Sequence, residues 1–171
     1  MIIGYFQAPI AWKSRRNAVF KNVMVYRIGE GFAPTLADVQ AALEPMQFVE
    51  CGASQVKSIG WVPPRGEAHG PLVESVAGQW IMKLMIESKA VPGNVVRRKA
   101  DERIAEIEAA TGRKPGKKEK RDLMDEVLLT LLPQAFARQS SVLVWMDLDN
   151  RRLVLNAGSQ GKADEVMSAL M

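Results

Sequence analysis

The sequence of 171 residues has one cysteine, Cys51, and one histidine, His69. A single cysteine excludes a disulfide within the chain and is typical of proteins that work in a reducing compartment. One cysteine and one histidine also fall short of the four ligands of a usual zinc site. No apolar run approaches the roughly 18 residues that a membrane-spanning helix needs. These absences favour a cytoplasmic protein without a membrane partner.

Residue patterns that carry catalysis are scarce as well. Gly112–Lys118 is rich in glycine and lysine, but it lacks the spacing and the preceding strand of a nucleotide-binding loop. His69 lies in a Gly/Pro loop without an assignable nucleophile, and Cys51 is expected to be a small buried side chain. Asp147 and Asp149 suggest a metal or nuclease pair, but a turn after a strand explains both. We therefore expect no catalytic residue, no metal and no cofactor.

The composition is that of a soluble globular protein, with 47% hydrophobic and 25% charged residues. The length suffices for one domain with a core, or for a domain with a projecting subdomain. Lys and Arg total 23 against 19 Asp and Glu, which gives a net charge of +4 and a pI near 9.3. Because this excess is mild, the distribution of the charge matters more than its sum.

Hydrophobic periodicity in the first half predicts strands around one capped helix. Val23–Ile28, Gln47–Cys51 and Gln79–Glu87 have strand composition. Thr35 is placed to cap a helix, with Asp38 three residues further on in a variant of the capping box. The apolar spacing then continues as far as Met46.

Two prolines and three tryptophans add further expectations. Gly60–Pro64 is expected to form a rigid extended turn, because the prolines exclude a helix. Trp61, Trp80 and Trp145 are expected in the core, although an exposed tryptophan can stack on an unpaired base.

The pattern changes to helical after Pro92-Gly93. A helix is expected to end at Thr111-Gly112, and a second one runs from about Lys117 until Pro133 kinks or stops it. Short connections of this kind join helices as an antiparallel hairpin. The hairpin interrupts an otherwise strand-rich chain.

The chain then returns to strand composition at Ser141–Asp147 and Leu153–Leu155, and a last helix begins near Lys162. The whole pattern predicts an α+β fold, with a mixed or antiparallel sheet as the body and a projecting helical-hairpin finger as a tip subdomain. The expected boundaries are residues 20–91 and 141–171 for the body, which is incomplete at its C-terminal end, and 92–140 for the finger.

Positive charge gathers on this helical segment. Lys89–Arg121 has 11 basic and 5 acidic residues, a net of +6, and Arg113–Arg121 alone has six basic residues and one acidic residue. Phosphate backbones bind such clusters by releasing condensed counterions, and no base needs to be read. The residues expected to contact DNA are Arg97, Arg98, Lys99, Arg113, Lys114, Lys117, Lys118, Lys120 and Arg121. Charged helix faces can also be merely solvated, or tied up in salt bridges such as those open to Arg98 and Arg103.

Several strings resemble one known family. They are Phe20–Arg27, Gly60–Pro64, Asp125–Leu128, Leu131–Phe136 and Val144–Asp147. Their order and approximate spacing are similar to those of the RdgC family. The resemblance covers the chain from residue 20 to the end.

The resemblance implies a ring-forming homodimer that encircles or lines duplex DNA with little sequence preference and restrains RecA-promoted recombination at the nucleoid. It implies that the finger tip meets its twin, with Leu132, Gln134 and Phe136 at the contact. Family sequences can have a basic residue where this chain has Gln134. Family members begin near the Phe20 motif, so residues 1–19 are expected to be a lead segment outside the fold. Family chains continue well beyond residue 171.

Three alternatives remain open. The leucine-rich second helix could dock a protein partner, in which case the basic turn is incidental. Phe136 could plug the base of its own hairpin rather than contact a second chain. Single-stranded DNA remains a possible partner beside duplex DNA.

Overall fold

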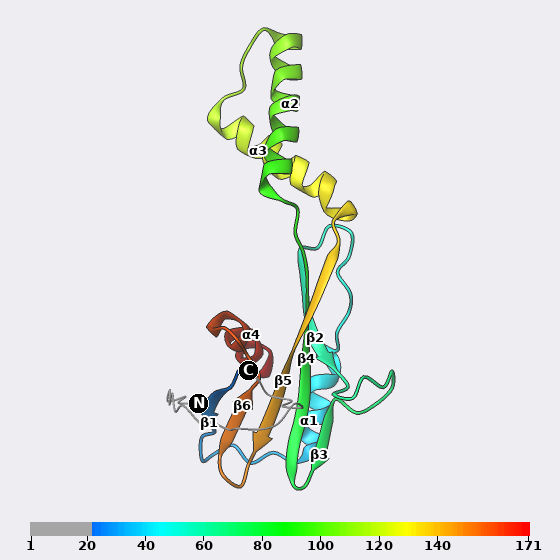
Figure 1. Cartoon of the computed structure of the whole chain (residues 1–171), viewed down its shortest axis with the longest axis vertical. Coiled ribbons are helices and arrows are strands. Elements are labelled where there is room, and N and C mark those ends of the chain that lie inside the picture. Colours follow the sequence, from blue (N-terminus) through cyan, green and yellow to red (C-terminus); the bar gives the residue numbers. More distant parts are fainter. Residues whose placement is uncertain (1–21) are drawn as a thin grey trace. The chain divides into compact units, whose positions relative to one another are not determined.

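The computed structural model describes residues 22–171, shown in Figure 1. This part of the chain has four α-helices and a six-stranded sheet, so the expected α+β class is confirmed. The expectation for residues 1–19 lies outside the described residues. None of the helices found among the described residues has the length and apolar composition needed to cross a membrane.

The described chain divides into two compact units. The first unit contains residues 22–49, 59–86 and 140–171, and the second contains residues 50–58 and 87–139. The second unit therefore includes a short loop segment from the first third of the chain together with the helical hairpin.

Six strands form one sheet in the order β1-β6-β5-β4-β2, and β3 pairs with β4 beside this path. The β1–β6, β5–β6 and β3–β4 pairs are antiparallel. The strands are β1 (Met24–Arg27), β2 (Lys57–Val62), β3 (Val73–Val76), β4 (Gln79–Lys89), β5 (Ala137–Asp147) and β6 (Arg152–Leu155). The strands expected near residues 23–28, 79–87, 141–147 and 153–155 are thus confirmed.

One strand prediction in the first half was wrong, and two strands were not predicted. Gln47–Cys51 forms no strand, because only Gln47 makes an isolated parallel bridge, to Trp61, and Val49 is 72% exposed. The strand in this region is β2, which includes the first three residues of the expected Gly60–Pro64 turn. The two prolines follow directly and end the strand. The pattern also missed β3, a short strand whose last two residues are exposed.

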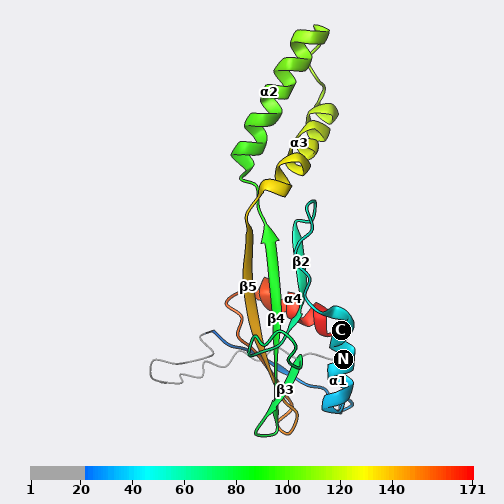
Figure 2. The ribbon, with the colours of Figure 1, turned by 90° about the vertical axis from the view of Figure 1, so that its right-hand side faces the viewer.

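The helices of the first unit are α1 (Leu36–Leu43), followed by the 3₁₀ turn η1 (Glu44–Met46), and α4 (Gln160–Leu170). The predicted capping box is confirmed: the Thr35 N–H donates to Asp38 Oδ2 at 2.9 Å, and the Asp38 N–H donates to Thr35 Oγ1 at 3.2 Å. Both helices lie on the same face of the sheet (Figure 2).

The core of the first unit lies between this sheet face and the two helices. Leu43 of α1 and Val166 of α4 belong to the same buried cluster as Met82, Val144 and Leu155 from three neighbouring strands. Alternate residues of β5 face this cluster, in keeping with the two-residue period of a strand. The core therefore has contributions from both ends of the chain.

The tryptophan expectations are met in part. Trp61 is buried in the core, and Trp80 is half-buried against it. Trp145 was wrongly expected in this core. It alternates with Val144 and Met146, so it lies on the opposite face of β5, paired with Val154 of β6.

The second unit contains the helical hairpin, which is made of α2 (Gly93–Thr111) and α3 (Lys117–Leu131). The two helices pack side by side, as Figures 1 and 2 show. Gly112 ends α2 with a φ of 68°, a left-handed conformation that favours glycine, and its N–H donates to Glu108 O at 2.9 Å. Pro133 lies in the 3₁₀ turn η2 (Leu132–Gln134), so it ends α3 as predicted.

Candidate nucleic-acid interface

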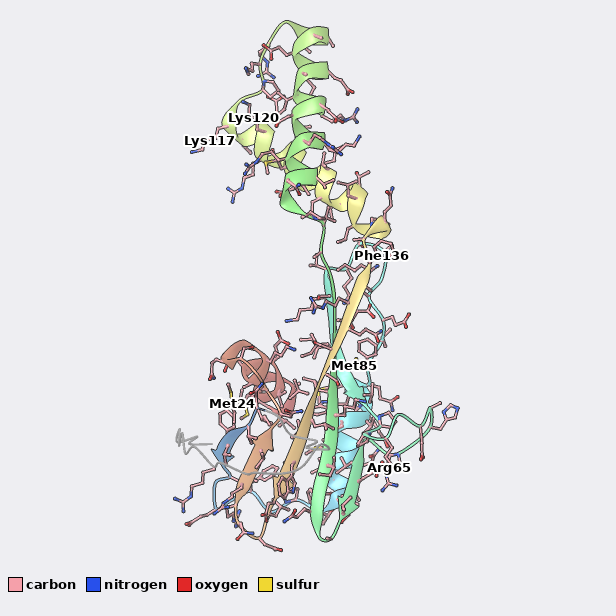
Figure 3. All side chains as sticks on the ribbon, viewed as in Figure 1. Met24, Arg65, Met85, Lys117, Lys120 and Phe136 are labelled. Atoms are coloured by element: carbon pink, nitrogen blue, oxygen red, sulfur yellow. The ribbon has the colours of Figure 1, made fainter. Side chains whose placement is uncertain are left out.

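Basic side chains gather where the turn of the hairpin enters α3. Lys114 lies in the turn, and Lys117, Lys118, Lys120 and Arg121 occupy the first turn and a half of the helix. Residues three and four apart lie on one side of a helix, so Lys117 shares a side with Lys120 and Arg121. Lys117 extends away from the hairpin in Figure 3. The structure thus brings five of the predicted DNA contacts together.

Most of this charge has no acidic partner. Among the ion pairs of residues 22–171, none involves the following six basic side chains: Arg97, Lys114, Lys117, Lys118, Lys120 and Arg121. All but the half-buried Lys120 are exposed. Unpaired and exposed like charges repel one another, and a polyanion relieves that repulsion.

The basic residues at the start of α2 are arranged differently. Arg98 Nε lies 3.9 Å from Glu102 Oε1, and Lys99 Nζ lies 3.1 Å from Glu102 Oε2. Arg103 pairs with Glu106 at 3.1 Å. The salt bridges expected for Arg98 and Arg103 therefore do form, and Lys99 adds one that was not expected. This group also lies roughly 20 Å along the helix from the turn, at 1.5 Å per residue.

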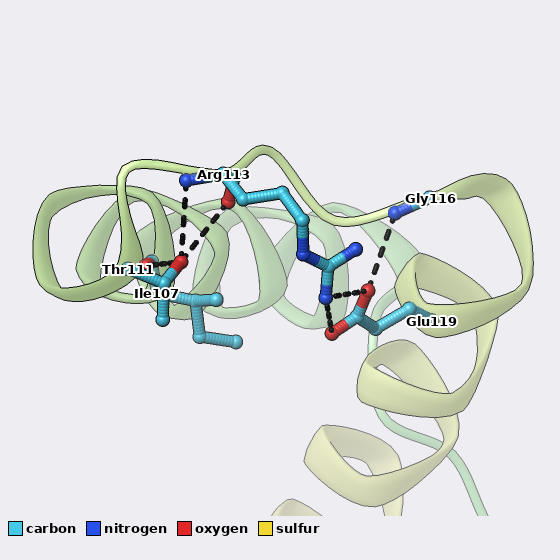
Figure 4. A network of polar contacts seen from close by, with 5 residues as sticks. All are labelled: Ile107, Thr111, Arg113, Gly116 and Glu119. Carbon is cyan, nitrogen blue, oxygen red and sulfur yellow. Dashed lines mark hydrogen bonds and ion pairs between the residues drawn. The ribbon is translucent and has the colours of Figure 1, made fainter.

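Arg113 is a further exception within the basic turn. Its Nη2 donates to both carboxylate oxygens of Glu119, at 3.2 and 3.1 Å (Figure 4). The Gly116 N–H also donates to Glu119 Oε2, at 3.3 Å. Glu119 was not predicted as a site residue, although a glutamate three residues after a helix-capping position is a recognisable capping signal.

The positive patch has a sharp boundary. Three acidic residues follow directly in α3: Asp122, Asp125 and Glu126. The unpaired positive charge of the hairpin is therefore concentrated at the turn and the start of α3.

The three residues expected at a tip contact lie in different environments. Phe136 is 94% exposed, which argues against the alternative that it plugs its own hairpin (Figure 3). Gln134 is exposed as well. Leu132 is 1% exposed, so its buried side chain does not lie on a surface that a second chain could contact.

The side chains considered as catalytic candidates, Asp147 and His69, lie in environments that a structural role explains. Asp147 Oδ1 accepts from the Asn150 N–H at 3.0 Å, and its Oδ2 accepts from Asn150 Nδ2 at 2.9 Å. These two hydrogen bonds hold the pKa of Asp147 below its usual range, and the bond from the Asn150 backbone has the larger effect. His69 is exposed in its loop. Within residues 22–171, no three His, Cys, Asp or Glu side chains meet in a way that could hold a metal ion.

Cys51 differs from its expected buried position. It is half-buried beside Glu87, which accepts a hydrogen bond from the Cys51 N–H at 2.7 Å. Burial raises the pKa of the Cys51 thiol, and the neighbouring Glu87 raises it further. The thiol is therefore poorly suited to act as a nucleophile at neutral pH.

Comparison with known proteins gives one consistent family. The family described as "Putative exonuclease, RdgC" matches residues 19–171. Proteins named recombination-associated protein RdgC are similar over 151 residues, with 37% identity in Aeromonas hydrophila, 38% in Tolumonas auensis and 36% in Salmonella paratyphi B. Each match covers 88% of this chain and 50% of the relative. The chain thus spans about half the length of the curated relatives that it matches.

Proposed function

The chain belongs to the RdgC family, and from this premise we propose that it is a recombination-associated protein that binds DNA without reading its sequence. One observation supports the binding mode above all others. Five exposed or half-buried basic residues without acidic partners lie together at the turn of the hairpin and the start of α3. Such a patch neutralises backbone phosphates, which every DNA sequence presents alike.

The proposed contact set is narrower than the sequence suggested. It contains Lys114, Lys117, Lys118, Lys120 and Arg121, and Arg97 is a separate additional contact. Arg98 and Lys99 are left out because Glu102 already neutralises part of their charge. Exposed pairs of this kind are individually weak, but they reduce the net field that a phosphate meets.

We further propose that two chains associate through the surface around Phe136, as the family resemblance implies, and that occupation of duplex DNA restrains RecA-dependent recombination at the nucleoid. An aromatic side chain with 94% exposure is unusual on a protein surface and typical of an interface anchor. Leu129 of α3 is also 57% exposed. The exposure of Leu129 and Phe136 also supports a second candidate function, in which α3 docks a different protein.

Salt dependence separates these two functions. The full chain is titrated with two duplexes of unrelated sequence at several salt concentrations. If the protein binds phosphates, both duplexes should bind with similar affinity. The logarithm of the binding constant should also fall steeply as the logarithm of the salt concentration rises. Apolar docking is nearly insensitive to salt. Failure to bind either duplex at low salt would refute the DNA-binding function.

A further inference from the structure

Arg113 differs from the other basic residues of the turn because its guanidinium already holds an anion. Nη2 donates to Glu119 Oε1 at 3.2 Å and to Oε2 at 3.1 Å. In the rest of the described turn, Lys114 and Lys117 have no such partner. A carboxylate and a phosphate offer a guanidinium the same kind of paired oxygens, so Glu119 occupies Nη2, one of the groups with which Arg113 would bind a phosphate, and neutralises its charge.

The backbone on both sides of this pair is fixed. On the α2 side, Thr111 Oγ1 donates to Ile107 O at 2.7 Å and accepts from the Arg113 N–H at 3.3 Å (Figure 4). On the α3 side, the Gly116 N–H donates to Glu119 Oε2 at 3.3 Å. The pair is therefore built into a turn that is held at both ends, which distinguishes it from a chance encounter of two long side chains.

Glu119 is also the only acidic residue between Arg113 and Arg121. If it served only to cap α3, a glutamine at this position would serve as well, because either side chain can accept from the capping N–H. Its charge adds two effects: it neutralises Arg113, and it lowers the positive potential of the patch that faces a polyanion.

We propose that Glu119 is an internal competitor for phosphate, which withholds Arg113 from DNA and attenuates the affinity of the patch. Phosphate contacts then come from the neighbouring lysines and Arg121, whereas Arg113 is a positioning residue that joins the two helices across the turn. This inference rests on the proposed DNA-binding function.

The test compares four versions of the 171-residue chain on one duplex over a salt series: wild type, Glu119→Gln, the double variant Arg113→Gln/Glu119→Gln, and Lys117→Gln as the matched control. The measured quantity is the slope of the logarithm of the binding constant against the logarithm of the salt concentration, called the log–log salt slope below. Each phosphate contact contributes about 0.9 to its steepness. Glu119→Gln releases Arg113, so its slope becomes steeper than wild type by about 0.9 and its affinity rises. The double variant keeps the wild-type slope, and Lys117→Gln is shallower by about 0.9.

Two results would overturn the inference while the proposed function stands. A double variant as shallow as Lys117→Gln would show that Arg113 contacts phosphate in the wild type. An unchanged slope for Glu119→Gln would show that nothing is withheld. If neither the wild type nor any variant binds the duplex, the proposed function itself fails.

A second measurement guards against a turn that loosens in the variants. The Nε–H resonance of Arg113 is followed by NMR as duplex is added, and circular dichroism reports helical content. The resonance is expected to stay in place in the wild type and to shift in Glu119→Gln. A wild-type shift as large as that of the variant would contradict the proposal, whatever the slopes.

Discussion

The Glu87 carboxylate of β4 accepts a hydrogen bond from the Gln139 side chain of β5, with Nε2 2.7 Å from Oε2. The other oxygen, Oε1, accepts from the Cys51 N–H, also at 2.7 Å. Lys89 adds a second link to the same loop, because its Nζ donates to Gly52 O at 3.0 Å. Glu87 is only 3% exposed, so one buried carboxylate joins a loop and two strands of the second unit.

These bonds make stability depend on the charge of Glu87. The hydrogen bonds from Gln139 and then Cys51 hold the pKa of Glu87 below its usual range. The stabilisation is therefore complete above the ordinary glutamate pKa, about 4.3, and is lost as pH falls through the lower folded-state value. Glu87→Gln should have a lower free energy of unfolding than the wild type at neutral pH, and the gap should narrow in acid.

Urea unfolding of both proteins across the acid range measures this gap. Asp38 and Asp147, whose pKa values are also lowered, are present in both proteins, so their titration cancels in the comparison. A gap that stays constant down to the acid limit would show that the charge of Glu87 is not the stabilising feature.

Gly60 is expected to tolerate no larger residue. A Cβ at this position would lie 2.4 Å from Phe48 Cα and 2.5 Å from Phe48 N, both of which are backbone atoms. Gly60→Ala should lower the free energy of unfolding by about 1–3 kcal/mol or more, as overpacking does. Gly31→Ala is the matched control, because a Cβ there meets nothing within 4 Å. Equal unfolding midpoints for the two variants would contradict the close approach.

Phe136 and Leu132 are four residues apart and should respond oppositely to truncation. Leu132→Ala removes a buried side chain and should cost about 2–5 kcal/mol of folding stability. Phe136→Ala should change stability by less than about 0.5 kcal/mol, as exposed positions do, while weakening self-association. Thermal melting at low protein concentration and sedimentation at high concentration measure the two effects. Unchanged sedimentation of Phe136→Ala would remove this residue from the proposed contact.

We expect no nuclease activity from this chain, because Asp147 at the end of β5 accepts hydrogen bonds from Asn150 and from Gln79 of β4. Supercoiled DNA incubated with the protein and Mg²⁺ or Mn²⁺ should remain intact. Asp147→Asn and Asp149→Asn provide the comparison. Metal-dependent nicking that either substitution abolishes would contradict this expectation.

The sequence predicted those parts of the fold in which local signals agree. Thr35 with Asp38, and Gly112 before Pro115, mark helix ends through contacts within a few residues, and these ends are where they were expected. The strand expected at Gln47–Cys51 failed because a strand needs a continuous partner, which apolar composition does not report. Likewise, the count of charged residues predicted where the basic turn lies, but it did not show which of those charges are neutralised by an acidic partner. The pairing of Arg113 with Glu119 depends on how the turn folds back.

The central claim is that unpaired basic residues at the start of α3 bind phosphates, and charge neutralisation with a salt series tests it most directly. The variant replaces Lys117, Lys118, Lys120 and Arg121 by glutamine. A control variant loses the same charge at Arg27, Lys83, Arg152 and Lys162 of the first unit. We predict that the log–log salt slope for duplex binding becomes shallower by roughly 0.9 for each of the four contacts, equally for unrelated sequences, and only in the first variant. An unchanged slope in that variant, or an equal loss in the control, would contradict it.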